Sequence, residues 1–258
     1  MNITSLFEFD IKLYNFLLIP KIILTVLKNY KAVKLAKKNK NLKNSVNGGT
    51  VYICGNGPSL KKVDLNNINA DYIVVNDFYK FEKKNPNNPP KFYMILDEDF
   101  LKEELQDRFQ GVFNPGFETT YVLNGLLEKR VSKEFSNLSP IYFCPWGQLY
   151  SSRKLFKFDC VHGRTWNVIC EAILFAMYLG YNEIRLLGCD YSVFATNAHF
   201  YPQIQKRPKL QGMLYKYCYT TQVHYEIAKY ALQKKVRIIN MTKDTLLDAY
   251  MIDENSSY

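Results

Sequence analysis

The stretch Val51–Asp64, VYICGNGPSLKKVD, decides the fold. It opens with four apolar residues, mostly β-branched or aromatic, which are the types that fill a buried strand. Glycines at 55 and 57 follow at once, and they allow a sharp turn with close approach of the backbone to a ligand. A proline and a serine then suit the first turn of a helix, whose N-terminus attracts phosphate. We therefore expect a strand, a turn and a helix, with ligand contacts at Gly55, Asn56, Gly57 and Ser59.

This glycine turn differs from the two common phosphate loops. It lacks the third glycine of the dinucleotide motif G-x-G-x-x-G, and it lacks the Gly-Lys-Ser/Thr of the P-loop. A turn that only connects a strand to a helix is therefore the alternative to a ligand-binding turn.

The chain beyond this stretch alternates short β-branched or aromatic runs with helical ones. Two long apolar runs, Thr165–Leu179 and Thr221–Gln233, are long enough to be crossover helices. This alternation predicts an α/β fold, namely a Rossmann-like, mostly parallel sheet with helices on both faces, over residues 50–258. Ligands of such sheets bind at the carboxyl ends of the strands. The candidate strands are Val51–Cys54, Tyr72–Val75, Phe92–Leu96, Thr120–Leu123, Ile141–Cys144, Glu183–Leu187 and Val236–Ile239.

Composition and charge exclude several classes of protein. With 258 residues, 47% of them hydrophobic, the chain can bury one sizeable core, so it is neither a disulfide-stapled miniprotein nor a disordered tail. Its six cysteines are scattered without a C-x-x-C pair, which favours a reduced cytosolic protein. The net charge is +10, but residues 1–49 carry +7 of it and the remaining chain only +3. Because the excess belongs to a tail, we expect no nucleic-acid partner.

The sequence of the tail, residues 1–49, indicates a basic amphipathic helix. Its apolar stretch Ile11–Leu27 is broken by Lys12, Pro20 and Lys21, so it does not suit a bilayer span of about 20 apolar residues. The lysine run that follows suits anionic headgroups, and we expect peripheral association with the inner face of the cytoplasmic membrane. The alternatives are packing on the domain or on a twin subunit of a homo-oligomer, and an RNA-binding arm. The run consists of Lys28, Lys31, Lys34, Lys37, Lys38, Lys40 and Lys43.

Polar side chains follow the second and third predicted strands. Asn76 offers both a donor and an acceptor, which fits a nucleobase edge or a sugar hydroxyl, with helix capping as the alternative. Asp97 and Asp99 form a D-x-D, the spacing with which many sugar transferases hold a divalent cation. Binding of a ligand hydroxyl by Asp97 and a solvated cap are the alternatives to metal ligation.

Further candidates lie in the second half of the chain. Arg164 and Thr165 stand at the start of a predicted helix and form a second candidate anion site. Gly188 and Asp190 again stand at a strand end. His199 lies on an irregular loop and is the preferred titratable group. The rival histidines are His162, a structural or capping residue, and His224, which falls in the middle of a helix and suits a packed side chain.

At these residues a family resemblance becomes visible. The segments ICGNGPSLKKVD, VVNDFY and LGYNEIRLLGCDY resemble, in this order, motifs of the bacterial lipooligosaccharide sialyltransferases, which use CMP-sialic acid. The outline is also similar to bacterial surface-polysaccharide proteins described as hydroxymethylpterin diphosphokinase-like. The resemblance spans about Val51–Asn240 and implies a GT-A-like variant of the predicted fold.

The resemblance also implies roles for single residues. Asn56 and Gly57 would contact the donor nucleotide, and Asn76 its sugar or phosphate end. Gly188 and Asp190 would lie beside the cytidine. The tyrosine at the donor phosphate would be Tyr191 or Tyr201.

This chain departs from the family pattern at three places. Asp97 stands where those enzymes have asparagine, and Asn167-Val168-Ile169 stands where they have Thr-Ser-Gly. Near the place of their histidine base this chain has Tyr217 and Cys218.

We therefore expect a glycosyltransferase of lipooligosaccharide or capsule polysaccharide biosynthesis. It would transfer a sialic acid-like, nonulosonic sugar from a CMP donor to a lipid-linked oligosaccharide. The expected catalytic residues are His199, as the base, and Asp97, with no metal required, although Mg²⁺ stays open. One alternative is a metal-dependent enzyme that uses an NDP-sugar or a pterin pyrophosphoryl donor through Asp97. The other is a non-catalytic nucleotide-binding module.

Overall fold

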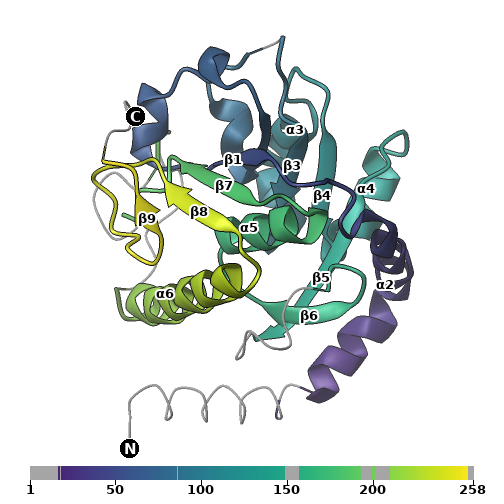
Figure 1. Cartoon of the computed structure of the whole chain (residues 1–258). Helices are drawn as coiled ribbons and strands as arrows, with labels where there is room; N and C mark the ends of the chain where they lie inside the picture. Colours follow the sequence, from purple (N-terminus) through teal and green to yellow (C-terminus); the bar gives the residue numbers. More distant parts are fainter. Residues whose placement is uncertain are drawn as a thin grey trace, which may run out of the picture.

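One parallel sheet forms the centre of the protein (Figure 1). This computed structural model describes residues 17, 19–85, 87–148, 157–192, 199–201 and 210–254. The strand order is β6-β5-β4-β3-β2-β1-β7-β8-β9, and every neighbouring pair is parallel. The predicted Rossmann-like α/β fold is thereby confirmed. The strands are β1 Thr50–Cys54, β2 Asp71–Val75, β3 Phe92–Ile95, β4 Thr120–Asn124, β5 Ile141–Gln148, β6 Val161–Arg164, β7 Glu183–Leu187, β8 Arg237–Asn240 and β9 Met251–Ile252.

The strand order reverses at β1. From β1 the chain proceeds outward through β2 to β6, and it then returns to place β7 on the other side of β1. Cys54 at the end of β1 is in register with Leu187 at the end of β7, and the Gly55 N–H donates to the Leu187 carbonyl at 2.7 Å. In open α/β sheets such a reversal opens a crevice at the carboxyl ends of the two strands.

Helices and short helical turns cover both faces of the sheet (Figure 1). On one face α5, Val168–Leu179, and α6, Leu210–Gln233, pack against inward-pointing strand residues such as Val51 and Ile53. On the other face α3, Gln106–Phe113, and α4, Glu128–Glu134, pack with residues such as Cys54. Because neighbouring residues of a strand point to opposite faces, each apolar strand contributes to both cores.

The helix boundaries differ from those predicted. α5 begins at Val168 rather than Thr165, because the Asn167 side chain accepts the Ile169 N–H and caps the helix. α6 begins at Leu210 rather than Thr221, and its first half is mostly exposed, so no regular apolar face marks it in the sequence. Residues 161–164 form β6, a short strand containing histidine, glycine and arginine, which the sequence analysis did not predict.

Part of the predicted N-terminal helix packs on the domain. Ala32, Val33 and Ala36 of α2, Tyr30–Ala36, are buried against Cys144 and Trp146 of β5. This is the packing alternative for that part of the tail, while residues 19–28 continue the helix with many apolar side chains exposed. No helix among the described residues is long and apolar enough to cross a membrane. Residues 1–16 and 18 of the predicted tail lie outside the described residues.

The remaining helical turns are short. They are η1 Lys37–Leu42, η2 Pro58–Lys62, η3 Leu65–Asn67, η4 Asn76–Lys80, η5 Glu98–Leu101, η6 Glu103–Leu105 and η7 Gly125–Leu127.

Candidate active site

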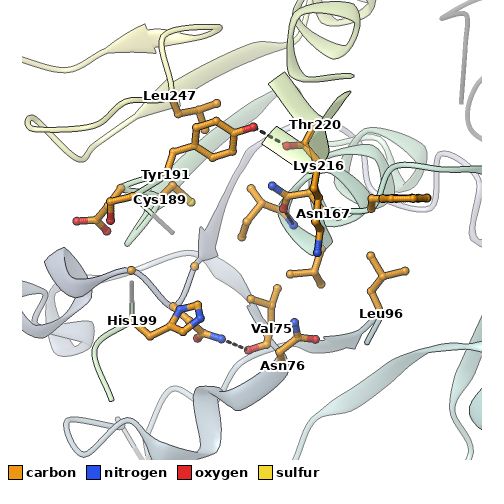
Figure 2. Close-up of a pocket in the computed structure, with 18 of the residues that line it drawn as sticks. Val75, Asn76, Leu96, Asn167, Cys189, Tyr191, His199, Lys216, Thr220 and Leu247 are labelled. Carbon is orange, nitrogen blue, oxygen red and sulfur yellow. Dashed lines mark hydrogen bonds between the residues drawn. The ribbon is translucent and has the colours of Figure 1, made fainter. Parts of the chain in front are cut away.

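A pocket of about 510 Å³ opens at the reversal point of the sheet (Figure 2). Its walls come from the ends of β1, β2, β3, β6 and β7, from the start of α5 and from the first half of α6. Pockets that bind small molecules and cofactors typically have volumes of about 300–1,000 Å³, so this pocket is large enough for such a ligand. Most of the predicted site residues line this single pocket. They are Gly55, Asn56, Gly57, Asn76, Asp97, Arg164, Gly188, Asp190, Tyr191 and His199.

Three predicted site residues do not line the pocket. The Ser59 hydroxyl donates to Asp190 at 2.8 Å, the Thr165 hydroxyl contacts Glu171 at 2.9 Å, and the Tyr201 hydroxyl donates to Asp77 at 2.8 Å. Each hydroxyl thus forms a hydrogen bond with a carboxylate of the protein. In this structure the three hydroxyls hold carboxylates beside the pocket, and the direct ligand contacts predicted for Ser59, Thr165 and Tyr201 stay predictions.

Glycine is required at the crossing of β1 and β7 by close packing of two backbones. A Cβ on Gly55 would lie 2.5 Å from the Gly188 carbonyl oxygen, and one on Gly57 would lie 1.9 Å from Asp190 Oδ2. Gly188 itself has a φ of 62°, in the left-handed region that glycine adopts without strain. The glycine pattern of the sequence therefore reflects the contact between the two turns as well as the access of a ligand.

The N-terminus of η2 is already occupied. Asp190 accepts the Ser59 N–H at 3.1 Å together with the Ser59 hydroxyl, so its carboxylate stands where the sequence predicted a phosphate. η2 is also a five-residue 3₁₀ turn. We correct the expected phosphate site at this helix: Asp190 joins the turn after β7 to the turn after β1.

Two asparagines present unpaired amide oxygens to the pocket. Asn56 Nδ2 donates to the Val75 carbonyl at 3.1 Å, but its Oδ1 is buried without a hydrogen-bond partner among the described residues. Asn76 Oδ1 is buried and unpaired in the same way, and the Asn76 side chain caps no helix. Since buried polar atoms normally have partners, both oxygens indicate a ligand that donates hydrogen bonds here.

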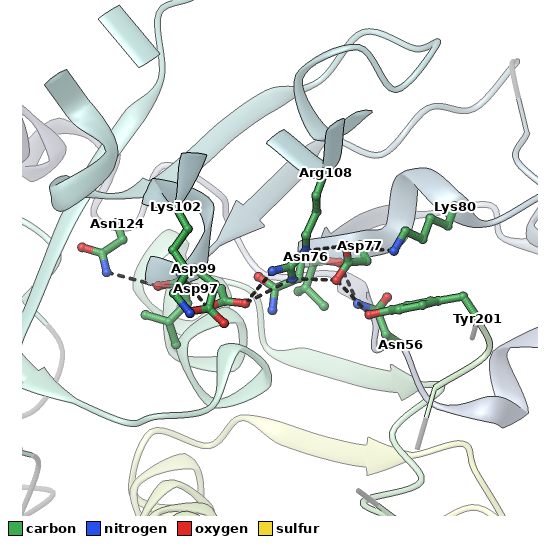
Figure 3. Close-up of polar contacts among 12 residues, drawn as sticks. Asn56, Asn76, Asp77, Lys80, Asp97, Asp99, Lys102, Arg108, Asn124 and Tyr201 are labelled. Atoms are coloured by element: carbon green, nitrogen blue, oxygen red, sulfur yellow. Dashed lines mark hydrogen bonds and ion pairs between the residues drawn. The ribbon is translucent and has the colours of Figure 1, made fainter. Parts of the chain in front are cut away.

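A charge network supports these asparagines from behind (Figure 3). Arg108 on α3 donates to both carboxylate oxygens of Asp77 at 2.7 Å and to Asp97 Oδ2 at 3.1 Å. Burial alone would raise the pKa of Asp77, but the hydrogen bonds and the charge of Arg108 outweigh burial and lower it. Asp77 is therefore held ionised by Arg108, which also binds Asp97 and which the sequence analysis did not single out.

The D-x-D carboxylates have partners within the protein. Asp97 Oδ1 accepts the Asp99 N–H at 3.0 Å and caps η5, while its other oxygen belongs to Arg108. Asp99 pairs with Lys102 at 2.6 Å. Among the described residues no cluster of three or more metal-ligating side chains occurs. Capping, one of the three alternatives for this motif, is the geometry observed.

His199 presents a free ring nitrogen. Its Nδ1 is buried without a hydrogen-bond partner among the described residues, and its ring stacks on Tyr201 with centroids 5.1 Å apart. Desolvation lowers the pKa of His199, although Asp77 and a hydrogen bond to the Asn56 backbone act in the opposite direction. A neutral imidazole with an unpaired nitrogen is able to accept a proton from a ligand hydroxyl.

The other two histidines are structural. His224 is fully buried, its Nδ1 contacts the Tyr250 hydroxyl at 2.8 Å, and burial lowers its pKa to about 3. His162 stacks on Phe143 and contacts the buried Glu171 at 3.4 Å. Both agree with the packed roles that their positions predicted.

The wall opposite the asparagines combines aromatic and basic groups. Tyr191 lines the pocket, but its hydroxyl contacts Thr220 at 2.6 Å and its ring packs 4.6 Å from that of Tyr217. The Tyr191 hydroxyl, which was predicted to contact the donor phosphate, therefore has a hydrogen-bond partner within the protein in this structure. Arg164 pairs with Glu98 at 2.8 Å, while its Nε is buried and unpaired among the described residues.

Backbone strain is concentrated at this pocket. Asn76, Trp166 and Tyr191 have φ angles of 42°, 59° and 57°, and all three line the pocket. They are three of the five non-glycine residues with positive φ among those described. Residues held in this region cost about 1–3 kcal/mol each and gather at functional sites.

Comparison with solved structures finds this fold in sialyltransferases. The crystal structure of the sialyltransferase CST-II in complex with a trisaccharide acceptor and CMP has a TM-score of 0.50, with 19% identity over 81% of this chain and 87% of that one. The chain has the fold of this enzyme. CstII from Campylobacter jejuni with cytidine-5'-monophosphate has a TM-score of 0.49 at 19% identity, over 80% of this chain and 85% of that one. The monofunctional alpha-2,3-sialyltransferase Cst-I from C. jejuni scores 0.49 at 16% identity, over 79% of both chains. No protein-family model and no curated protein matches the chain.

The pocket residues that the sequence analysis missed lie on α6 and just before α5. Trp166, Lys216 and Thr220 line the pocket. Lys216 and Thr220 belong to the part of α6 that precedes the predicted helix Thr221–Gln233, so no helical spacing placed them on one face. Only the position of α6 across the strand ends brings them to the site (Figure 2).

Proposed function

We propose that the protein is a glycosyltransferase that moves a nonulosonic sugar from a CMP donor to an oligosaccharide acceptor. One observation carries the proposal. Polar atoms of Asn56, Asn76, Arg164 and His199 that are buried and lack a hydrogen-bond partner among the described residues converge on one pocket at the reversal point of the sheet. Amide oxygens, a guanidinium N–H and an imidazole together match the mixed donors, acceptors and charge of a nucleotide-activated sugar.

The choice of CMP as nucleotide has two supports. The CST-II structure of this fold is in complex with a trisaccharide acceptor and CMP. In this chain Asp97 is already paired with Arg108, and Asp99 with Lys102, which opposes a cation held by the D-x-D between two phosphates. A monophosphate donor, whose departing charge is met by protein cations, fits this arrangement better than a pyrophosphate donor.

His199 would act as the general base. The acceptor hydroxyl oxygen forms a bond to the anomeric carbon, and its proton passes to the unpaired His199 Nδ1. The bond between that carbon and the phosphate oxygen breaks, and its electron pair leaves with CMP. Because desolvation keeps the pKa of His199 below its ordinary value, the ring is neutral at pH 7 and ready to accept this proton.

The acceptor would be linked to lipid, and the protein would work at the inner face of the cytoplasmic membrane. Residues 17–43 contain eight lysines and no acidic residue. The inner side of this helical segment, including Val26 and Ala32, faces β5, while its outer side is apolar and exposed. Exposure of the large outer residues runs from 46% to 67%, in Leu17, Ile19, Ile23, Leu24, Leu27 and Tyr30. An apolar stripe with flanking lysines suits an anionic lipid surface.

A donor screen tests the proposal. Purified protein is incubated with CMP-sialic acid and related CMP-sugars, and the release of CMP is measured with and without oligosaccharide acceptors. We expect acceptor-dependent release that is insensitive to EDTA. Thermal-shift measurements against CMP, UDP, GDP and ATP, with and without Mg²⁺, should place the largest stabilisation with CMP. Stabilisation only by a diphosphate with Mg²⁺ would favour the pyrophosphate enzyme, and CMP binding without turnover would favour a binding module.

A further inference from the structure

The first half of α6 directs a lysine into the pocket. Met213, Lys216, Tyr217 and Thr220 all line it, and their spacing places them on one face of the helix. Figure 2 shows the Lys216 side chain reaching from α6 into the pocket toward the strand ends. Lys216 as a whole residue is exposed to solvent, and it also lines the pocket.

The charge of Lys216 has no close partner within the described part of the chain. No hydrogen bond or ion pair joins it to another described residue. Desolvation lowers the pKa of Lys216, while Asp97 and Asp99 act in the opposite direction. Those two carboxylates are already paired with Arg108 and Lys102. The ammonium is therefore a surplus positive charge at the pocket.

Arg164 brings a second cation to the same wall. It comes from the end of β6, and its charge is felt at Lys216. One arm of its guanidinium pairs with Glu98, while the buried Nε has no partner among the described residues. We call the Lys216 ammonium and the Arg164 guanidinium the basic pole of the pocket. Two cations with unused hydrogen-bond donors in a partly desolvated wall favour an anionic ligand group.

We propose that the basic pole binds the donor phosphate and that Lys216 is a catalytic residue, stabilising the charge of the departing CMP. The inference rests on the proposed function. When the bond from the anomeric carbon to the phosphate oxygen breaks, its electron pair moves onto that oxygen. Lys216 keeps its proton and donates a hydrogen bond to the phosphate, and Arg164 Nε donates a second one. The tyrosine hydroxyls predicted for this task, on Tyr191 and Tyr201, are engaged with Thr220 and Asp77.

Paired ligands that differ only in phosphate test the basic pole. Affinities for CMP and for cytidine are measured by calorimetry in the full chain and in Lys216→Met, Lys216→Arg and Lys229→Met. Lys229 is the matched control, because it lies on the same helix but is exposed and pairs with Glu226. We expect Lys216→Met to weaken CMP binding by about 10- to 100-fold and to leave cytidine unchanged. Lys216→Arg should recover most of the loss, and Lys229→Met should change nothing.

The outcomes separate this inference from the proposed function. An equal loss for CMP and cytidine, or no loss for either, overturns the role of Lys216, while CMP binding in the full chain keeps the donor assignment. If the full chain binds neither compound, the CMP assignment fails, and inorganic pyrophosphate replaces CMP as the probe in thermal-shift measurements. Stabilisation that is lost in Lys216→Met then supports the basic pole for another phosphate ligand. Equal stabilisation in both proteins, or none in the full chain, overturns it.

Discussion

Arg108 grips Asp77 with two parallel hydrogen bonds of 2.7 Å, and the same guanidinium reaches Asp97 on the next strand end. Asp77 directly follows Asn76, so this bidentate pair sets the position of an asparagine whose amide faces the pocket. The side chain of Asp77 is 5% exposed and that of Arg108 is 16% exposed. The pair is thus a buried brace between α3 and the ligand side of the sheet.

Removing the arginine should be costly. Arg108→Met leaves the Asp77 carboxylate buried without its partner, and we expect a loss of about 3 kcal/mol in the free energy of unfolding. Urea unfolding at pH 7 measures this loss. Asp77→Asn with Arg108→Met removes both charges and should restore part of the stability. A loss below about 1 kcal/mol for Arg108→Met alone would contradict a buried brace.

Acid should weaken the same pair. Because the folded-state pKa of Asp77 lies below its ordinary value of 3.8, its contribution is present above that value and is lost as the pH falls through the folded pKa. We expect the free energy of unfolding to decline below about pH 4, with a shallower decline in Asp77→Asn. Unfolding curves at several pH values check this, and identical slopes in both proteins would speak against it.

Two substitutions of Asn76 distinguish the effect of backbone strain on stability from the effect of its amide on ligand binding. With a φ of 42°, Asn76→Ala should lose about 1 kcal/mol of stability, whereas Asn76→Gly adopts the same backbone without strain. Both variants lack the amide, so both should lose the stabilisation by CMP. Melting temperatures with and without CMP measure the two effects, and undiminished stabilisation in Asn76→Gly would remove Asn76 from the site.

Adding a single methyl group in the turn after β1 should lower the free energy of unfolding. Gly57→Ala places a Cβ 1.9 Å from Asp190 Oδ2, and we expect a loss of about 1–3 kcal/mol as the two turns separate. Gly212→Ala is the matched control, because it lies in α6 with open space around it and should gain up to about 1 kcal/mol. Denaturant unfolding compares the two, and equal stabilities would refute close packing at this turn.

The pH dependence of transfer should report His199. Since its pKa is lowered below 6.5 by desolvation, the base is neutral at pH 7, and the rate should fall only at a pH below that value. His199→Ala should lose about 100-fold in kcat or more. Initial rates of CMP release between pH 5 and 8 give both values. If the rate of CMP release already falls at a pH above 6.5, or if His199→Ala keeps full activity, then a residue other than His199 is the base.

The exposed N-terminal stripe should bind lipid. Replacing Ile23, Leu24 and Leu27 together by serine should abolish cosedimentation with vesicles rich in anionic lipid and leave the melting temperature unchanged, because these side chains are exposed. Leu232→Ser is the control, since Leu232 is 77% exposed on another helix. Should the triple variant instead convert a dimer to a monomer in light scattering, the stripe is a contact between copies of the chain.

The elements that the sequence predicted well are those with a local signal. Seven strands were placed to within a few residues, because buried parallel strands appear as short, continuous apolar runs. β6 and β9 were missed, since one contains glycine and arginine and the other is a two-residue edge strand. The early start of α6 was missed because its first half has no apolar face.

The sequence alone determined the parallel α/β fold and the edge at which ligands bind, because apolar runs and glycine turns are written in consecutive residues. Only the tertiary structure decided which polar groups face the pocket. Asp190 turned inward to Ser59, Arg108 neutralised Asp77 and Asp97, and Lys216 was carried to the site by α6. These partners are far apart in the chain, and hydrogen bonds or charges act through space, so no local pattern records which of them meet.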